Sequence, residues 1–308
     1  MHRRAGPSRA LVTGPAGFIG AKLCEQLRPD GWEVHGLCRH SSGLLCPGVT
    51  RWECALDDTD TLARLLKYLR PEVIFHTAGF TSAARDLSAV IPSFQANLVS
   101  TVHLLKAAAG NACPRIVLSG SLEEPQATDA APSSPYAASK AAATAYAQMF
   151  WQLFRLPVTM ARIYMVYGPA QRDLKKLIPY TILSMLEGTR PQFTSGNRKV
   201  DWIFVDDVVR GMIALARAEG VEGRAVDLGT GVATSVREVV EMIAGLMGSG
   251  VPTFGGLPDR SDEQVRVADV ACTEAMLGWK PSTTLRDGLA RTIAYYRARV
   301  GATVGGRR

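Results

Sequence analysis

The chain has 308 residues, 47% of them hydrophobic and 20% charged, which is the composition of a folded globular protein and excludes a largely disordered one. Much of its formal net charge of +7 comes from arginines near the two ends, and no expected helix carries a dense stripe of lysine and arginine with interleaved aromatic residues. We therefore expect no nucleic-acid partner and a preference for anionic small molecules.

From residue 10 onward, short apolar segments alternate with longer amphipathic ones. Strands are predicted at residues 10–13, 33–37, 73–76, 115–119 and 158–162, and helices at residues 17–27, 58–68, 97–109 and 136–154. Strands of four or five residues that alternate with helices of ten or more predict a parallel sheet with helices on both faces. The predicted fold class is therefore α/β, a Rossmann-type doubly wound parallel sheet with a smaller C-terminal lobe.

The alternation stops after Gly168 and Pro169, where proline and glycine become frequent. We assign residues 1–168 to the domain that carries the sheet and residues 169–308 mainly to a substrate-binding lobe. Segments 200–218 and 225–228 are apolar enough to return to the sheet. The lobe is thus expected to be discontinuous, with the sheet completed by parts of residues 200–230.

A glycine-rich loop joins the first predicted strand to the first helix. Residues 13–20 read TGPAGFIG, with the spacing GxxGxxG. The first glycine permits a sharp turn, the second lets the backbone approach a pyrophosphate, and the third lets the helix pack close to the strand. The helix N-terminus adds N–H donors and partial positive charge. This context makes residues 1–168 an NAD(P)-binding domain, although such glycines can also serve a turn alone. The predicted phosphate-binding residues are Gly14, Gly17, Phe18, Ile19 and Gly20.

The end of the second strand bears on the choice of cofactor. An acidic residue at this place binds the ribose hydroxyls of NAD, whereas arginine accommodates the extra phosphate of NADP. No acid is present in residues 38–42, and Arg39, Ser41 and Ser42 offer a positive charge and hydrogen-bond donors. NADP(H) is therefore favoured over NAD(H). The alternative is a solvated loop in which Arg39 only stacks on the adenine.

Tyr136 and Lys140 lie four residues apart at the start of a helix, on one face. A phenol has an ordinary pKa of about 10, and a nearby ammonium group together with a cationic nicotinamide lowers it. Tyr136 can then exchange a proton with a substrate oxygen while hydride moves at carbon. Ser121, beyond the strand at 115–119, can hold the same oxygen, and Asn97 can orient Lys140 through a water.

The cysteines and histidines give no sign of a metal site. Six cysteines are present, none in a CxxC pair, and the histidines at 76 and 103 stand alone. We therefore expect no metal, and reduced, buried thiols. The apolar run at residues 11–14 is too short for a signal core or a membrane span, so we expect a cytoplasmic protein with no membrane partner.

Together these motifs resemble extended short-chain dehydrogenases/reductases of the NAD-dependent epimerase/dehydratase family, which act mostly on nucleotide sugars. The matching segments are TGPAGFIG (13–20), HTAG (76–79), Asn97 with Thr101, SGS (119–121), YAASK (136–140), VYGP (166–169), VDWIFVDDV (200–208), LGTG (228–231) and LGWKP (277–281). The resemblance implies a cofactor site that also includes Asp57, Ala78, Gly79, Tyr136, Lys140 and Ile163. It implies substrate contacts by Thr81, Glu123, Met165, Arg198 and Arg260.

Two segments narrow the resemblance. Residues 33–42 are similar to the NADP-binding turn of GDP-mannose dehydratases, and residues 120–124 resemble a segment of GDP-4-keto-6-deoxymannose reductases. In 4,6-dehydratases, a glutamate at the position of Glu123 removes the C5 proton, but those enzymes generally have an acid or small polar residue where Leu122 stands. The resemblance thus implies an NADPH-dependent reduction of a 4-keto sugar, and dehydration with Glu123 as the catalytic base is the minor alternative.

Several positions depart from the family pattern. The family often has an aspartate where Ala55 stands, for which Asp57 and Asp58 are the candidate substitutes, and usually an asparagine where Met165 stands. Diphosphate-binding arginines are usual where Val200 and Leu257 stand. The candidate replacements for that charge are Arg198, Lys199, Arg260 and Arg266.

The leading hypothesis is an NADPH-dependent ketoreductase that acts on a 4-keto nucleotide sugar. The alternatives are a nucleotide-sugar 4-epimerase or 4,6-dehydratase with tightly bound NAD, a ketoreductase for a non-nucleotide secondary-metabolite ketone, and a dinucleotide-sensing scaffold without catalysis. Many members of the family pair through two helices. Residues 93–109 and 136–154 are the corresponding segments here, so we expect a homodimer.

Overall fold

The computed structural model describes residues 8–39, 45–82, 84–111, 113–125, 131–248, 250, 252–259 and 265–305. Three predicted site residues, Ser41, Ser42 and Arg260, lie outside these ranges. The chain divides into two compact units. The first consists of Met1–Ile163, Val209–Asp227 and Ala275–Trp279, and the second of Tyr164–Val208, Leu228–Glu274 and Lys280–Arg308. The boundary proposed at residue 168 stays a prediction.

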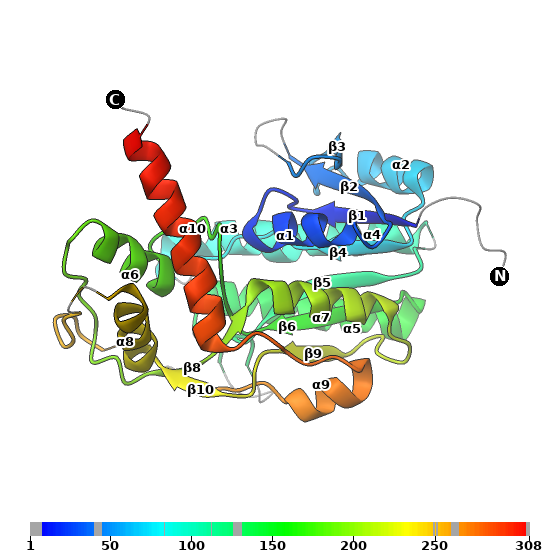
Figure 1. Cartoon of the computed structure of the whole chain (residues 1–308). Coiled ribbons are helices and arrows are strands. Elements are labelled where there is room, and N and C mark those ends of the chain that lie inside the picture. The colour runs from blue at the N-terminus through cyan, green and yellow to red at the C-terminus, as the bar shows by residue number, and fades with distance from the viewer. Residues whose placement is uncertain are drawn as a thin grey trace. The chain divides into compact units, whose positions relative to one another are not determined.

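The first unit is built on a seven-stranded sheet in the order β3-β2-β1-β4-β5-β6-β9 (Figure 1). Its strands are β1 (Arg9–Thr13), β2 (Glu33–Cys38), β3 (Thr50–Glu53), β4 (Val73–His76), β5 (Ile116–Ser121), β6 (Val158–Ile163) and β9 (Ala225–Leu228). Neighbouring strands from β3 to β6 run parallel. The strand order reverses between β1 and β4, and doubly wound sheets bind ligands beyond the carboxyl ends of the strands at such a point. The predicted α/β Rossmann fold is confirmed.

The helices of this unit are α1 (Phe18–Leu27), α2 (Thr59–Leu69), α4 (Ser100–Ala109) and α5 (Pro135–Phe154), with most of α7 (Val205–Arg217) and the end of α9 (Val270–Leu277). The limits of α2 follow from its sequence. Asp58 caps it by accepting the Thr61 N–H, and Leu62 and Leu66 are buried one turn apart. Arg70 then ends it in the left-handed conformation, at φ 49°.

The helix predicted at residues 97–109 begins earlier and is irregular. A 3-10 turn (Leu87–Ala89), α3 (Val90–Ser93) and a π-helical stretch (Phe94–Val99) precede α4. A π turn holds one more residue than an α turn and is frequent at functional sites. It leaves Asn97 only 1% exposed. Apolar periodicity assumes a uniform helix, so it could not place this start.

The second unit contains a small sheet in the order β10-β8-β7, made of β7 (Met165–Tyr167), β8 (Lys199–Phe204) and β10 (Ala233–Ser235). Its helices include α6 (Leu177–Leu186), α8 (Val236–Met247) and α10 (Leu285–Gly305). The prediction that residues 200–218 return to the large sheet is wrong for β8, which pairs antiparallel with β10 and parallel with β7. The strand at 225–228 does join the large sheet, as β9 beside β6.

Candidate active site

The glycine loop lies between β1 and α1 with the geometry that a bound phosphate needs. Gly14 has φ 67°, and a Cβ there would lie 2.9 Å from the Ala78 backbone. A Cβ on Gly20 would lie 2.2 Å from the Gly14 carbonyl oxygen, so only glycine lets α1 approach β1. Gly17 caps α1 without a side chain, and the first turn, which includes Phe18 and Ile19, holds no acidic residue. The N–H groups of this turn are thus available to an anion such as a dinucleotide pyrophosphate.

Behind the loop, a buried histidine joins three elements. His76 Nδ1 lies 2.8 Å from Thr13 Oγ1, and His76 Nε2 lies 3.1 Å from Thr101 Oγ1. The Thr13 hydroxyl also accepts the Ala78 N–H at 3.2 Å. Burial, with a smaller effect of Lys140, lowers the pKa of His76 to about 3. His76 is therefore neutral at neutral pH and fixes the ends of β1 and β4.

Asn97 fastens the segment that follows β4. Its side-chain oxygen accepts the Phe80 N–H at 2.7 Å, and its amide group donates to Phe80 O at 3.0 Å and to Ser139 Oγ at 2.9 Å. A Cβ on Gly79 would lie 2.7 Å from Asn97 Oδ1, which explains the glycine. Asn97 thus ties this segment to α5, whereas its water-mediated action on Lys140 stays a prediction.

Ser121, Tyr136 and Lys140 come together where β5 ends and α5 begins. Ser121 is the last residue of β5, lies opposite Ile163 in β6, and hydrogen-bonds the Tyr136 phenol. Lys140 Nζ donates to Ser119 O at 2.8 Å and lies 5.9 Å from the centre of the Tyr136 ring. The helix begins in this place because Ser134 accepts the Ala137 N–H and Pro135 occupies the first turn.

The electrostatics around these residues differ from the sequence-based expectation. Burial raises the pKa of Tyr136 to about 12, the Ser121 hydrogen bond opposes this rise, and Glu123 and Glu124 add to it. Burial lowers the pKa of Lys140 to about 8. The prediction of a lowered Tyr136 pKa is not met by the described side chains, because burial and two carboxylates disfavour the phenolate.

The two glutamates after Ser121 lie in different surroundings. Glu123 is half-buried, and its Oε2 accepts the Ser134 hydroxyl at 3.4 Å. Glu124 is 5% exposed and accepts the Ser121 N–H at 2.7 Å and the Thr144 hydroxyl at 2.8 Å. From the sequence we assign a role to Glu123 and none to Glu124, because the Glu124 partner Thr144 lies 20 residues away.

The remaining predicted cofactor residues of the first unit lie near strand ends. Arg39 follows β2 and is exposed, as are Asp57 and Gly79. Ala78 is half-buried after β4. The predicted substrate residue Thr81 is exposed in the same segment. These positions keep polar groups accessible beyond the carboxyl ends of the strands.

The second unit shows where the predicted substrate residues Met165 and Arg198 lie. Met165 is half-buried in β7, and Arg198 precedes β8. Val200, where the family usually has arginine, is 5% exposed in β8 and is part of the hydrophobic core of this unit. The Arg266 guanidinium lies 5.9 Å from the centre of the Tyr164 ring. Arg198, Lys199 and Arg266 thus remain the described candidates for a diphosphate.

Three further observations concern metals, membranes and thiols. Within the described ranges, no group of three or more His, Cys, Asp and Glu side chains is arranged to hold a metal ion, and no helix is long and apolar enough to cross a membrane. All six cysteines are free thiols, but Cys272 is exposed, so the expectation of buried thiols is wrong for that residue.

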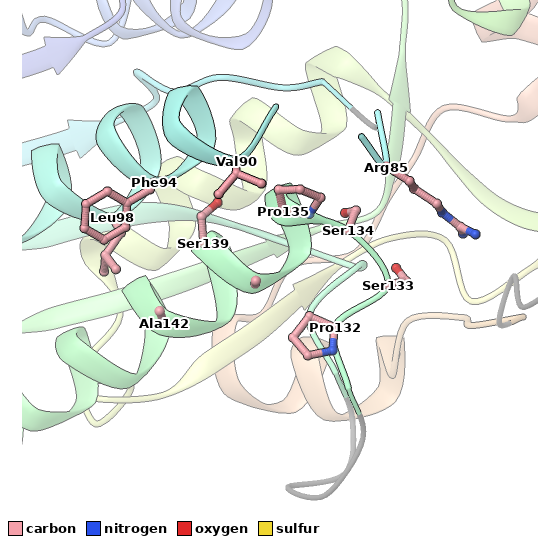
Figure 2. Close-up of a pocket in the computed structure, with 11 residues that line it drawn as sticks. Arg85, Val90, Phe94, Leu98, Pro132, Ser133, Ser134, Pro135, Ser139 and Ala142 are labelled. Carbon is pink, nitrogen blue, oxygen red and sulfur yellow. The ribbon is translucent and has the colours of Figure 1, made fainter. Parts of the chain in front are cut away.

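A groove with a volume of about 600 Å³ runs along the surface between α5 and the segment before α4. Figure 2 shows its mostly apolar lining and the single cationic side chain, Arg85. The other lining residues include Val90, Phe94, Leu98, Pro135 and Ala142. Phe94 is 46% exposed. An apolar groove beside exposed aromatic groups is typical of a protein interface.

Comparisons with known proteins agree on one family. Residues 10–229 match the NAD dependent epimerase/dehydratase family. The chain is 34% identical over 312 residues to UDP-glucose 4-epimerase of Mycolicibacterium smegmatis, covering 94% of this chain and 98% of that protein. It is 31% identical over 320 residues to dTDP-glucose 4,6-dehydratase of an Actinoplanes species, covering 94% and 98%. The solved structure of MoeE5 in complex with UDP-glucose and NAD has a TM-score of 0.83 at 29% identity, covering 95% of this chain and all of that one.

Proposed function

The chain belongs to the NAD-dependent epimerase/dehydratase family of nucleotide-sugar-modifying enzymes, and from this premise we propose that it is a nucleotide-sugar 4-epimerase. The observation that carries the proposal is the gathering of Ser121, Tyr136 and Lys140 where β5 ends and α5 begins. These are the groups that a reversible oxidation of a sugar hydroxyl requires.

In this proposal Ser121 and Tyr136 act on the C4 hydroxyl of the sugar, and Lys140 acts on Tyr136. Ser121 holds the C4 hydroxyl, and Tyr136 takes its proton and later returns it. Lys140, held by Ser119 O at 2.8 Å, contributes a positive charge beside the Tyr136 ring. The bound dinucleotide supplies the hydride acceptor and donor. Because both proton and hydride return to the sugar, the reaction consumes no external reductant.

The relatives favour the epimerase or dehydratase alternative over the ketoreductase that the sequence analysis put first. UDP-glucose and NAD are bound in the MoeE5 structure, which supports a nucleotide sugar as substrate and NAD as cofactor. The preference for NADP that Arg39 suggests remains a prediction, and binding measurements with both cofactors decide it.

A 4,6-dehydratase is the second candidate, and Glu123 is the observation that favours it. Its carboxylate is half-buried two residues after Ser121, near Tyr136, where it raises the pKa of the phenol. A base at that place would take the C5 proton, but the usual polar neighbour is replaced by Leu122. Epimerisation needs no such second base, so we place it first.

One assay separates the three reactions. The purified protein is incubated in D₂O with UDP-glucose or dTDP-glucose, and the nucleotide sugars are followed by NMR. A C4 epimer without deuterium in the sugar supports the epimerase. A 4-keto-6-deoxy product with solvent deuterium at C5 would overturn it in favour of the dehydratase. A parallel incubation with NADPH and a 4-keto nucleotide sugar tests the third reaction, and oxidation of NADPH there, with no epimer formed in the first incubation, would overturn the proposal in favour of the reductase.

We also propose that two copies of the chain pair through residues 93–109 and α5. The groove beside α5 and its exposed apolar side chains, which include Phe94, Tyr146 and Leu153, support this pairing. Sedimentation at working concentration is expected to show a dimer, and Phe94→Glu to weaken it by placing a charge in an apolar contact. A monomeric wild-type protein would refute the pairing.

A further inference from the structure

A buried carboxylate connects the strand that carries Ser121 to the helix that carries Tyr136 and Lys140. Glu124 Oε1 accepts the Ser121 N–H at 2.7 Å, and Glu124 Oε2 accepts the Thr144 hydroxyl at 2.8 Å. The Glu124 N–H in turn donates to Ser121 O at 3.2 Å. Two hydrogen bonds between Ser121 and Glu124 therefore close the turn after β5, and the Glu124 side chain joins this turn to α5.

Glu124 is attached to α5 at Thr144, on the helix face that carries the candidate site. Tyr136, Lys140 and Thr144 follow one another at intervals of four residues, so they share one face of α5. Glu124 holds the third of these side chains, while the first two belong to the candidate site. The contact thereby fixes the position of Ser121 along the same helix face.

The backbone leaves room for this carboxylate. A Cβ on Gly120 would lie 2.8 Å from Glu124 Oε1, closer than side-chain carbons normally approach. Any larger residue at position 120 would displace the carboxylate from the Ser121 N–H. The need to leave space for the Glu124 carboxylate thus explains why residue 120 is glycine.

The carboxylate also acts through its charge. Glu124 raises the pKa of Lys140 against the burial that lowers it, and it raises the pKa of Tyr136. The other ionisable groups that interact with this pair are Glu123 beside Tyr136 and His76 beside Lys140. His76 is neutral, so Glu124 is the negative group that supports the Lys140 ammonium.

We propose that Glu124 is a positioning residue that holds Ser121 against α5 and places a negative charge one helical turn from Lys140. The inference rests on the proposed function, because it gives the two residues their catalytic meaning. Its physical content, the titration of Lys140 and the placement of Ser121, is measurable without substrate.

The test uses variants that separate charge from contact. Glu124→Gln keeps an oxygen for the Ser121 N–H and removes the charge, whereas Thr144→Val keeps the charge and removes one hydrogen bond. Asp207→Asn is the matched control, since Asp207 is a buried carboxylate of the second unit that accepts the Ser282 and Thr283 N–H groups.

The first readout is the titration of Lys140 by NMR of protein with ¹³C-labelled lysine, assigned through the signal lost in Lys140→Arg. Glu124→Gln is expected to lower the Lys140 midpoint from about 8 by about one pH unit, while Thr144→Val and Asp207→Asn leave it in place. An unchanged midpoint in folded Glu124→Gln protein would overturn the proposal. An equal shift in Thr144→Val would do the same.

The second readout is the pH profile of turnover. In Glu124→Gln, both limbs of the kcat profile are expected to move to lower pH, because loss of a negative charge lowers the pKa of Lys140 and of Tyr136 together. In Thr144→Val, kcat is expected to fall about tenfold with little change in KM and no shift of the limbs. If kcat falls in both variants but the limbs of the Glu124→Gln profile do not move, Glu124 has only a structural role, and the proposed effect of its charge is refuted. Absence of epimerase activity in the wild type would refute the proposed function alone, since the NMR titration is independent of it.

Discussion

The second unit buries Asp201 behind backbone N–H groups, whereas the first unit buries Lys140 beside Tyr136 and buries His76 between two threonine hydroxyls. Asp201 accepts N–H groups at 2.7 to 3.0 Å from Thr230, Gly231 and Ala268, so its charge is used to hold loops together. Lys140 and His76 instead have pKa values of about 8 and about 3, far from their ordinary ones. Strongly shifted groups beside a hydrogen-bonded tyrosine indicate chemistry. Substitution of Tyr136 should therefore change turnover more than stability, and substitution of Asp201 the reverse.

The largest expected effect tests the first half of this comparison. Tyr136→Phe removes the proton-transferring hydroxyl and little volume, so we expect kcat to fall about 10³-fold with cofactor binding and melting temperature nearly unchanged. Steady-state kinetics, cofactor fluorescence and thermal unfolding check this. Tyr146→Phe, at an exposed tyrosine of the same helix, is the control and should retain activity. Retained activity in Tyr136→Phe would mean that the phenol is not the proton donor.

The next effect tests the second half. Asp201→Asn has one oxygen where the carboxylate has two, so buried N–H groups lose partners, and we expect a loss of roughly 3 kcal/mol in the free energy of unfolding. Urea denaturation measures it, and kcat of the folded protein should stay within about twofold. Asp259→Asn is the control, because Asp259 accepts the Ser195 N–H on the exposed surface. Equal losses in the two variants would show that the burial of Asp201 is unimportant.

The alternation of segments explains how much of the first unit could be predicted. Strand β4 occupies residues 73–76, as its apolar run predicts, and the glycine loop and Tyr136 lie where their spacing places them. Strand β3 was missed because Thr50–Glu53 is an edge strand with no buried residue, and it therefore lacks an apolar pattern. The His76 and Glu124 networks were missed for another reason. They join residues 20 to 63 positions apart, and local pattern carries no information on such contacts.

A smaller effect depends on pH. The pKa of His76 is lowered to about 3, so the unfolded chain binds a proton between pH 6.5 and about 3 that the folded protein does not. Stability contributed by this group is complete above pH 6.5 and falls as the pH drops, by roughly 2 kcal/mol at pH 5. Urea denaturation at pH 7 and pH 5 should show the loss in wild type. His76→Gln should be less stable at pH 7 but lose less between the two values, and an equal pH-dependent loss would exclude His76 as its source.

The smallest effect concerns an exposed charge of the first unit. Arg39 follows β2 at the surface, so its contact with a cofactor is screened by solvent, and we expect Arg39→Ala to weaken NADPH binding only about tenfold. NADH binding should be unaffected, because NADH lacks the phosphate that Arg39 would meet. Titration of intrinsic fluorescence with each cofactor measures both, and Arg64→Ala, at an exposed arginine of α2, is the control. Equal weakening for both cofactors would place the guanidinium on the adenine that they share. No weakening for either would remove the basis for an NADP preference.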